Sequence, residues 1–344
     1  MLQRVKYLAA ALGLVLILAA LSRFRPESLT GFQPGPLVVD LPFGNGPRDV
    51  GRAQGIDGRE YGPLTFATNG AETVVADTYH QRLLWIRSGR AVSQAAPGQM
   101  IEDVAMNRAG EVVAADNRSL ALWLFTPRAA RKIVQFESFP GFSSALWRVG
   151  LGAPNRIFVE RISFGRGSFA SQLDEYTLDG RFVRRVAASR AGRNADGAPT
   201  PRALAMPIRN FQVAGNGAIY VEPANASRYE RVIRVYRPDG SLAGTVVVHS
   251  REPIQNSDFL GISDQGWVYV GVNLDVAGRA RVLIVTRTGQ LLAALSVPAV
   301  PVYAATYGRV LPSGVLYLDA STPQAYQIRE YLPKQRTVWR WRGF

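Results

Sequence analysis

The sequence contains no cysteine and only two histidines, and just three of its basic residues are lysines. The lack of cysteine excludes disulfides, thiolate metal sites and cysteine nucleophiles, and it leaves the cellular compartment open. Because His80 and His249 are the only histidines, neither a serine–histidine–aspartate triad nor a multi-histidine metal site has support. Walker, GxGxxG and HExxH patterns are missing too, so nucleotide and zinc-protease chemistry have none either.

The chain has 344 residues, of which 47% are hydrophobic and 19% are charged. These values suit a globular protein with a large core. The formal charge of +14 is carried almost wholly by arginine, and such a charge favours acidic partners, such as anionic polymers or lipid head groups. The arginines are scattered along the chain rather than clustered, which is typical of a solvated surface, and we expect no nucleic-acid partner.

An uncharged run, Tyr7–Leu21, follows Arg4 and Lys6 near the beginning of the chain. A basic segment followed by an apolar one is typical of an export signal. The run is short for a spanning helix, which needs roughly 20 apolar residues, and Ala20-Leu21-Ser22 is a small-x-small cleavage site. We therefore expect residues 1–25 to be either a cleaved signal peptide or a membrane-anchor helix. The rest of the chain would then lie outside the cytoplasm, tethered to the membrane or secreted.

Residues 26–62 are rich in glycine and proline and are predicted to be a linker with one strand, Leu37–Leu41. The part that follows, residues 63–344, begins with strand-like runs around an Asn69-Gly70 turn. Asn-Gly between two apolar runs is a strong hairpin signal, because both turn positions need positive φ. This pattern of short strands recurs five more times along the chain.

The turn between the first two strands of each unit sets the repeat period. Successive turn residues lie 40, 45, 62, 49 and 48 residues apart, and they are Gly70, Gly110, Asn155, Gly217, Gly266 and Gly314. Four strands per unit at a period of about 40 to 50 predict a β-propeller. We therefore expect an all-β, six-bladed β-propeller. Its last unit should end with a turn at Lys334-Gln335 and the strand Thr337–Trp341, and Leu37–Leu41 should pair with that blade and close the ring.

The segment Val74 to Leu83, Val-Val-Ala-Asp-Thr-Tyr-His-Gln-Arg-Leu, resembles an NHL-type repeat. Asp116 and Asp319 keep the aspartate of this pattern, Glu160 and Glu222 replace it, and Gly271 loses it. The resemblance implies a six-bladed propeller of the TolB-like and SMP-30-like superfamily at fold level. That superfamily includes binding scaffolds as well as lactonases and lyases, so function does not follow from the fold.

In such a propeller, the connections between strands b and c and between strands d and a share one face. All the long connections of this sequence are of these two kinds: 162–171, 187–206, 223–231, 250–256, 273–278 and 298–305. Binding residues concentrate on long loops held by a rigid scaffold. This long-loop face is therefore the predicted binding face.

Counting back seven residues from each turn residue locates the mouth of the central channel. The count gives Pro63, Asp103, Arg148, Asn210, Phe259 and Tyr307, with Asp258 one residue before Phe259. The candidates for the channel mouth are Asp103, Arg148, Asn210, Asp258 and Tyr307. Asp103, Asn210 and Asp258 carry the hard oxygen ligands that suit Ca²⁺, and metal-dependent lactonases of the resembled superfamily use such a set. The presence of Arg148 in this set instead indicates a polar, water-filled channel in which Arg148 pairs with an aspartate. Both interpretations remain open.

The leading functional prediction is a non-catalytic binding or scaffold propeller that engages a protein or an anionic polymer through its long-loop face. The alternative is a metal-dependent lactonase-like hydrolase or lyase, with His249 or His80 as the only candidates for a histidine base. Glu60-Tyr61-Gly62-Pro63 resembles the Glu-Gly-Pro motif of those lactonases, with a tyrosine inserted. Asp77 and Asp116 are expected to cap their b–c turns by hydrogen bonding to backbone N–H groups.

Two connections on the predicted binding face are basic. Arg190, Arg193 and Arg202 lie in 187–206 with a single acidic residue, Asp196, and Arg166 lies in 162–171. Together these connections would form a positive lip that clamps an acidic partner through charge-assisted hydrogen bonds.

Overall fold

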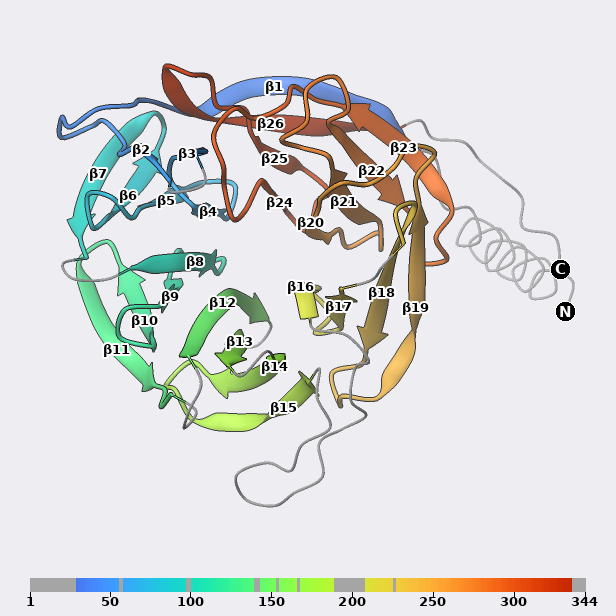
Figure 1. Ribbon diagram of the computed structural model, residues 1–344, viewed down its shortest axis with the longest axis horizontal. Coiled ribbons are helices and arrows are strands. Elements are labelled where there is room, and N and C mark those ends of the chain that lie inside the picture. Colours follow the sequence, from blue (N-terminus) through green and yellow to red (C-terminus); the bar gives the residue numbers. More distant parts are fainter. Residues whose placement is uncertain are drawn as a thin grey trace, which may run out of the picture.

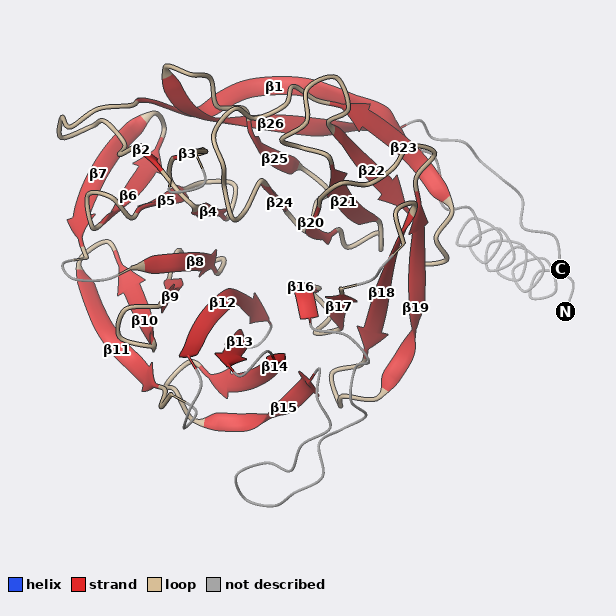
Figure 2. Ribbon diagram, viewed as in Figure 1, coloured by secondary structure: helices blue, strands red, loops and turns tan. Residues whose placement is uncertain are grey.

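A computed structural model describes residues 29–335 except 56–57, 97–99, 139–142, 153–154, 166–167, 189–207 and 225–226. Six four-stranded antiparallel sheets stand around a central axis as the blades of a propeller (Figure 1). Every regular element among these residues is a strand (Figure 2). The predicted fold class is therefore confirmed for the propeller, whereas the predicted N-terminal helix lies outside the described residues.

The first three blades follow the chain in order. Blade one contains β4 (Thr65–Thr68), β5 (Thr73–Asp77), β6 (Arg82–Arg87) and β7 (Arg90–Ala95). Blade two contains β8 (Ile101–Met106), β9 (Val112–Asp116), β10 (Ala121–Thr126) and β11 (Ala129–Gln135). Blade three contains β12 (Ser143–Gly152), β13 (Arg156–Gly165), β14 (Ser168–Thr177) and β15 (Phe182–Ala188).

The remaining blades complete the ring. Blade four contains β16 (Ile208–Val213), β17 (Ile219–Pro223), β18 (Glu230–Tyr236) and β19 (Leu242–His249). Blade five contains β20 (Ser257–Ile262), β21 (Val268–Val272), β22 (Arg281–Val285) and β23 (Leu291–Ser296). Blade six combines β24 (Gly308–Val310), β25 (Leu316–Asp319) and β26 (Ala325–Gln335) with β1 (Leu29–Pro42). A two-residue ladder, β2 (Ala53–Gln54) with β3 (Glu60–Tyr61), precedes blade one.

The predicted turn residues all adopt positive φ, as the hairpin argument requires. Their φ angles are 92° (Gly70), 83° (Gly110), 54° (Asn155), 79° (Gly217), 78° (Gly266) and 88° (Gly314). L-residues rarely adopt this region, which explains why five of the six positions are glycine and the sixth is asparagine. The repeat period read from the sequence is therefore the spacing of the blades.

The ring is closed by the N-terminal strand. β1 is the outermost strand of blade six and pairs with β26, with Leu37 opposite Arg329 and Leu41 opposite Tyr326. The predicted pairing of Leu37–Leu41 is thus confirmed. The predicted turn at Lys334-Gln335 is wrong, because both residues continue β26 and pair with β1. Thr337–Trp341 lies outside the described residues.

After β1, the chain crosses to blade one and is fixed there by polar contacts. Asp77 Oδ1 accepts a hydrogen bond from the Gly51 N–H at 3.0 Å. The Arg82 guanidinium donates to the backbone oxygens of Pro47, at 3.0 Å, and Asp49. Blades six and one are therefore joined by a covalent segment as well as by packing.

The core consists of apolar layers between neighbouring blades. One layer packs Val74 and Trp85 of blade one against Val112 and Phe125 of blade two. Each blade packs one face of its sheet against each of its two neighbours, so removing one blade would expose two apolar faces. This packing fixes the inner strands, which carry the channel residues.

Blade three differs from the prediction. Ile162–Ser171 was expected to be a long loop but extends β13 and β14, in which Ile162 pairs with Ser171 and Phe164 with Phe169. Ile162 and Ser171 are both buried, and this burial sustains the pairing beyond the usual strand length. The connections 250–256, 273–278 and 298–305 lie outside the strands, as predicted.

Candidate functional site

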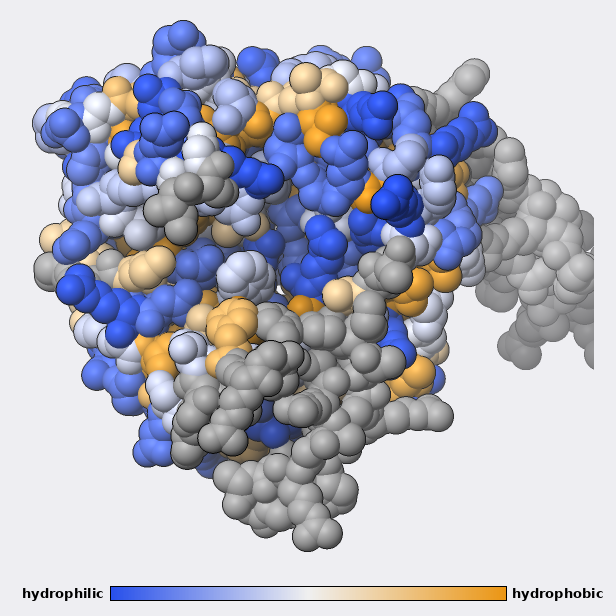
Figure 3. Space-filling view, in the orientation of Figure 1, coloured by the Kyte–Doolittle hydropathy of each residue, from blue (hydrophilic) through white to orange (hydrophobic). Residues whose placement is uncertain are grey.

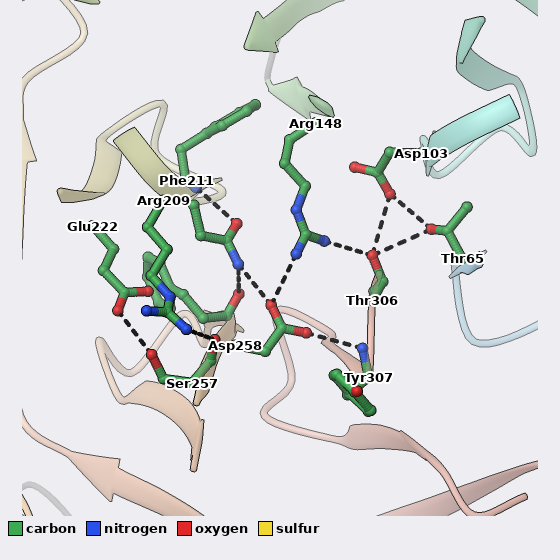
Figure 4. Close-up of polar contacts among 12 residues, drawn as sticks. Thr65, Asp103, Arg148, Arg209, Phe211, Glu222, Ser257, Asp258, Thr306 and Tyr307 are labelled. Atoms are coloured by element: carbon green, nitrogen blue, oxygen red, sulfur yellow. Dashed lines mark hydrogen bonds and ion pairs between the residues drawn. The ribbon is translucent and has the colours of Figure 1, made fainter. Parts of the chain in front are cut away.

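The five channel-mouth candidates lie on or beside the inner strands of blades two to six, and Asp103, Arg148, Asp258 and Tyr307 are labelled in Figure 4. Asp103, Arg148, Asn210 and Asp258 lie on β8, β12, β16 and β20, and Tyr307 immediately precedes β24. All five are buried. Counting back from the turns therefore placed these residues at the channel mouth, because each lies seven or eight residues before the a–b turn of its blade.

Arg148 crosses the channel to the blades on the far side. Its Nη1 donates to Thr306 Oγ1 at 2.6 Å, and its Nη2 lies 3.4 Å from Asp258 Oδ1. The exposed fraction of Arg148 is 9% and that of Asp258 is 4%. The structure thus contains the arginine–aspartate pair that was one of the two interpretations of the sequence.

Both oxygens of Asp258 have protein donors. Oδ1 also accepts the Asn210 Nδ2 at 2.6 Å, and Oδ2 accepts the Tyr307 N–H at 2.9 Å. The remaining polar atom of the Asn210 amide, Oδ1, accepts the Phe211 N–H at 2.8 Å. Blades three to six are joined through this one carboxylate.

Asp103 makes a similar set of contacts on the other side of the channel. Its Oδ1 accepts Thr65 Oγ1 at 2.7 Å and Arg309 Nη2 at 2.6 Å. Its Oδ2 accepts the Val149 N–H at 3.0 Å. Thr306 Oγ1 accepts Arg148 Nη1 and lies 3.3 Å from Asp103 Oδ1, so the two aspartates and two arginines belong to one continuous network of ion pairs and hydrogen bonds.

These contacts do not fit a Ca²⁺ site. Ca²⁺ takes six to eight oxygen ligands, whereas the oxygens of Asp103, Asn210 and Asp258 already accept guanidinium, amide, hydroxyl or backbone donors. No group of three or more histidine, aspartate or glutamate side chains in the described part of the chain is arranged to hold a metal.

Two carboxyl groups near Arg148, one buried and one half-buried, were not among the predicted site residues. Glu160 pairs with Arg148 across β12 and β13, is fully buried, and neither of its carboxyl oxygens has a hydrogen-bond partner among the described residues. Burial raises the pKa of Glu160 to about 8 and that of Glu102 to about 7, and Arg148 opposes part of each rise. A sequence signal for Glu160 existed, since it replaces the aspartate of the repeat pattern.

Of the two aspartates that were predicted to cap b–c turns, one does so. Asp116 Oδ1 accepts the Arg118 N–H at 3.0 Å and so caps its own turn, as expected. Asp77 instead holds the N-terminal segment through Gly51, and its Oδ2 lies 2.7 Å from His80 Nδ1. His249, at the end of β19, is exposed and lies 3.1 Å from Glu230. The contacts of both histidines therefore lie outside the channel-mouth group.

A cleft of about 710 Å³ opens on the long-loop face next to the channel mouth. Its walls come from the β2–β3 segment and from three of the predicted loops: 250–256, 273–278 and 298–305. The residues that line it include Arg59, Glu60, Gln255, Asn256, Asp275, Tyr303 and Tyr307. Tyr307 belongs both to this cleft and to the channel mouth, so the two features are continuous. A view along the axis shows a mainly hydrophilic face with a central hollow (Figure 3).

Backbone and aromatic contacts hold the cleft walls in place. The Tyr303 N–H donates to Glu60 O at 2.8 Å, and the Val300 N–H donates to Leu274 O at 2.9 Å. The ring of Tyr303 lies 5.1 Å from that of Tyr61 and 6.4 Å from that of Tyr307. Glu60 therefore helps to build the cleft, where it pairs with Arg52 at 3.3 Å, rather than joining the channel-mouth residues.

Four further arginines were predicted to bind the partner. Arg166, Arg190, Arg193 and Arg202 lie outside the described residues. In the described part of the chain, no helix is long and apolar enough to cross a membrane, and the predicted export segment also lies outside that part.

Comparison with known proteins supports the fold alone. No protein-family model matches the sequence, and no curated protein matches it significantly. A luciferin-regenerating enzyme is 12% identical, with a TM-score of 0.50 over 77% of this chain and 90% of its own. A catalytically inactive virginiamycin B lyase from Staphylococcus aureus, determined with quinupristin, is 11% identical, with a TM-score of 0.50 over 88% of this chain and 100% of its own. These likenesses agree with the predicted propeller fold.

Proposed function

We propose that this protein is a non-catalytic binding propeller outside the cytoplasm, which engages a protein segment or an anionic polymer in the cleft of its long-loop face. The observation that carries the proposal is the neutralised channel mouth beside an open cleft. Arg148 and Arg309 pair with Asp258 and Asp103, so these carboxylates are already engaged as structural partners, while the cleft beside them has the volume of a ligand site.

The lining of the cleft supports an extended, acidic ligand. Its two acidic side chains already have partners, since Glu60 pairs with Arg52 and Asp275 accepts the Asn256 amide. Arg59 adds a cation to the wall, and the chain as a whole carries a charge of +14. Tyr303 and Tyr307 add aromatic surface, which supplies contact area at a low cost in side-chain entropy.

The location rests on the sequence. Tyr7–Leu21 has the composition of an export segment, and we propose that it directs the propeller across a membrane and either tethers it there or is removed. A reporter that is active only outside the cytoplasm, fused after Phe344, should be active. Activity of a cytoplasmic-only reporter at the same junction would contradict this location.

Binding can be tested by capture with the immobilised full-length protein. The double change Gln255→Ala and Tyr303→Ala should abolish capture of the partner, because both side chains line the cleft. The control change Gln265→Ala, in an exposed turn on the opposite face, should leave it intact. Equal capture by both variants would place the binding site elsewhere.

The contrasting class, a metal-dependent lactonase, makes a different prediction. Elemental analysis and lactone hydrolysis with and without a chelator would detect it. We expect no hydrolysis that is sensitive to the chelator. Turnover abolished both by the chelator and by Asp258→Ala would overturn the binding proposal.

A further inference from the structure

The face opposite the long loops has a basic rim. Each of the five described turns between strands c and d holds or adjoins an exposed arginine, and these residues are Arg87, Arg90, Arg128, Arg181, Arg237 and Arg287. The same five turns contain only two acidic residues, Asp179 and Asp239. With six exposed arginines against two acidic residues, these five turns form a net basic rim around the disc.

Several of these cations are not neutralised by the fold. Arg90, Arg128 and Arg287 form no ion pair with any residue that the structure describes. Arg87 has Glu72 at 3.7 Å, but its side chain is 74% exposed, and such a pair is weak in water. The rim therefore remains attractive to anions.

A pocket interrupts the rim between blades four and five. Its volume is about 340 Å³, and both Arg237 and Arg287 line it together with Tyr220, Val235, Tyr236 and Pro238. Arg237 Nη1 donates to Ser241 Oγ at 3.1 Å, which holds the side chain on its own turn. Two cations beside an apolar wall suit a phosphate group attached to a hydrophobic body.

The chain enters the propeller on this same face. β26 begins at the b–c loop of blade six and ends at Gln335, opposite Leu29 of β1. The first residue of β1 is thus at the c–d end of the blade, away from the long loops. Seven residues, 22–28, separate the predicted export segment from Leu29. They can span at most about 25 Å, so a tether at Tyr7–Leu21 would keep this face near the bilayer.

We propose that the basic rim docks on a membrane surface of anionic phospholipids, with a lipid phosphate in the Arg237–Arg287 pocket, so that the cleft faces away from the bilayer. The inference rests on the proposed tether but not on the proposed ligand of the cleft. Each arginine near an anionic membrane surface contributes an attraction of about fivefold in the binding equilibrium. Loss of the two pocket arginines should therefore reduce the ratio of docked to undocked protein roughly 25-fold.

The absence of cysteine makes the orientation measurable in the full-length protein. Single cysteines at Gln290, in an exposed c–d turn, and at Ala277, in an exposed b–c loop of the same blade, would each carry a fluorophore. The protein is reconstituted in vesicles of phosphatidylcholine alone or mixed with phosphatidylglycerol, with a quencher on the lipid head groups. The label at Gln290 should be quenched in the anionic vesicles at low salt, and the label at Ala277 should not.

The matched variants separate a specific surface from general basicity. Arg237→Ser with Arg287→Ser should relieve the quenching at position 290, whereas Arg228→Ser with Arg279→Ser, which removes two exposed arginines of the long-loop face, should leave it unchanged. Equal quenching at the two labels, or equal effects of the two double variants, would overturn the proposal.

Two further results would also contradict it. Vesicle flotation tests the membrane tether separately. If the protein does not float with anionic vesicles, both the proposed tether and the proposed docking are contradicted. Sodium phosphate that relieves quenching more than sodium chloride of the same ionic strength would assign the pocket to a free phosphate rather than a lipid. Equal relief by the two salts, through screening alone, is the expected result.

Discussion

Glu160→Gln should make the protein more stable, and increasingly so as the pH rises. The carboxyl group of Glu160 is fully buried without a hydrogen-bond partner among the described residues. Burial raises its pKa from the ordinary value of 4.5 to about 8, and Arg148 offsets only part of this effect. Between about pH 4.5 and pH 8, Glu160 is protonated in the folded state and ionised in the unfolded state. The free energy of unfolding of the wild type therefore falls as the pH rises through this range. Glutamine keeps the shape of the side chain and removes the charge.

The rise in the pKa of Glu160 sets the size of the stability gain expected for Glu160→Gln. One pKa unit corresponds to about 1.4 kcal/mol, so the advantage of the variant should grow by about 3 kcal/mol between about pH 5 and pH 8. Urea unfolding of the full-length protein in mild detergent, followed at several pH values, measures this difference. Glu137→Gln, at an exposed position, is the control and should show no such trend. A difference between wild type and Glu160→Gln that stays constant from pH 5 to pH 8 would refute the argument.

Three further changes test the remaining parts of the fold. Arg148→Met should destabilise the protein by about 3–5 kcal/mol, because it leaves Asp258 buried without its cation; a loss below about 1 kcal/mol in urea unfolding would show that the pair is not needed. Gly180→Ala should cost well over 1 kcal/mol, since Gly180 has φ +92° and an added Cβ would lie 2.0 Å from a backbone oxygen of blade two; Gly244→Ala, which meets no neighbour within 4 Å, is the control, and similar melting temperatures for the two would contradict the account. Deleting residues 1–50 removes β1 and should lower the melting temperature by roughly 10 °C or more, whereas deleting residues 1–28 should not, and equal effects would mean that β1 does not close the ring.

Local signals explain what the sequence predicted correctly. Positive φ at the a–b turns selects glycine or asparagine, and in blades two to six a residue seven or eight positions before the turn lies at the channel mouth. Asp103, Arg148, Asn210, Asp258 and Tyr307 were therefore found without any knowledge of their contacts. Each of these inferences uses only neighbouring residues in the chain.

Contacts between distant segments explain the errors and omissions. Residues 162–171 were predicted to be a loop because they include Gly165 and Ser168, but these two residues pair with each other at the end of β13 and β14. The outer strand of blade six comes from the other end of the chain, so Lys334 and Gln335 were taken for a turn. The partners of Asp103 lie on other blades, and the cleft is built from segments of the sequence that are far apart. No local pattern identifies such neighbours.

The central claim, that ligand binds in the cleft of the long-loop face, can be tested by photo-crosslinking. A photoreactive amino acid replaces Gln255, an exposed cleft residue, or Gln265, an equally exposed glutamine on the opposite face of the disc. The full-length variants are irradiated in intact cells, and covalent adducts are identified by mass. The account predicts a partner adduct at position 255 and none at position 265. Adducts at position 265 alone, or none at either position, would contradict it.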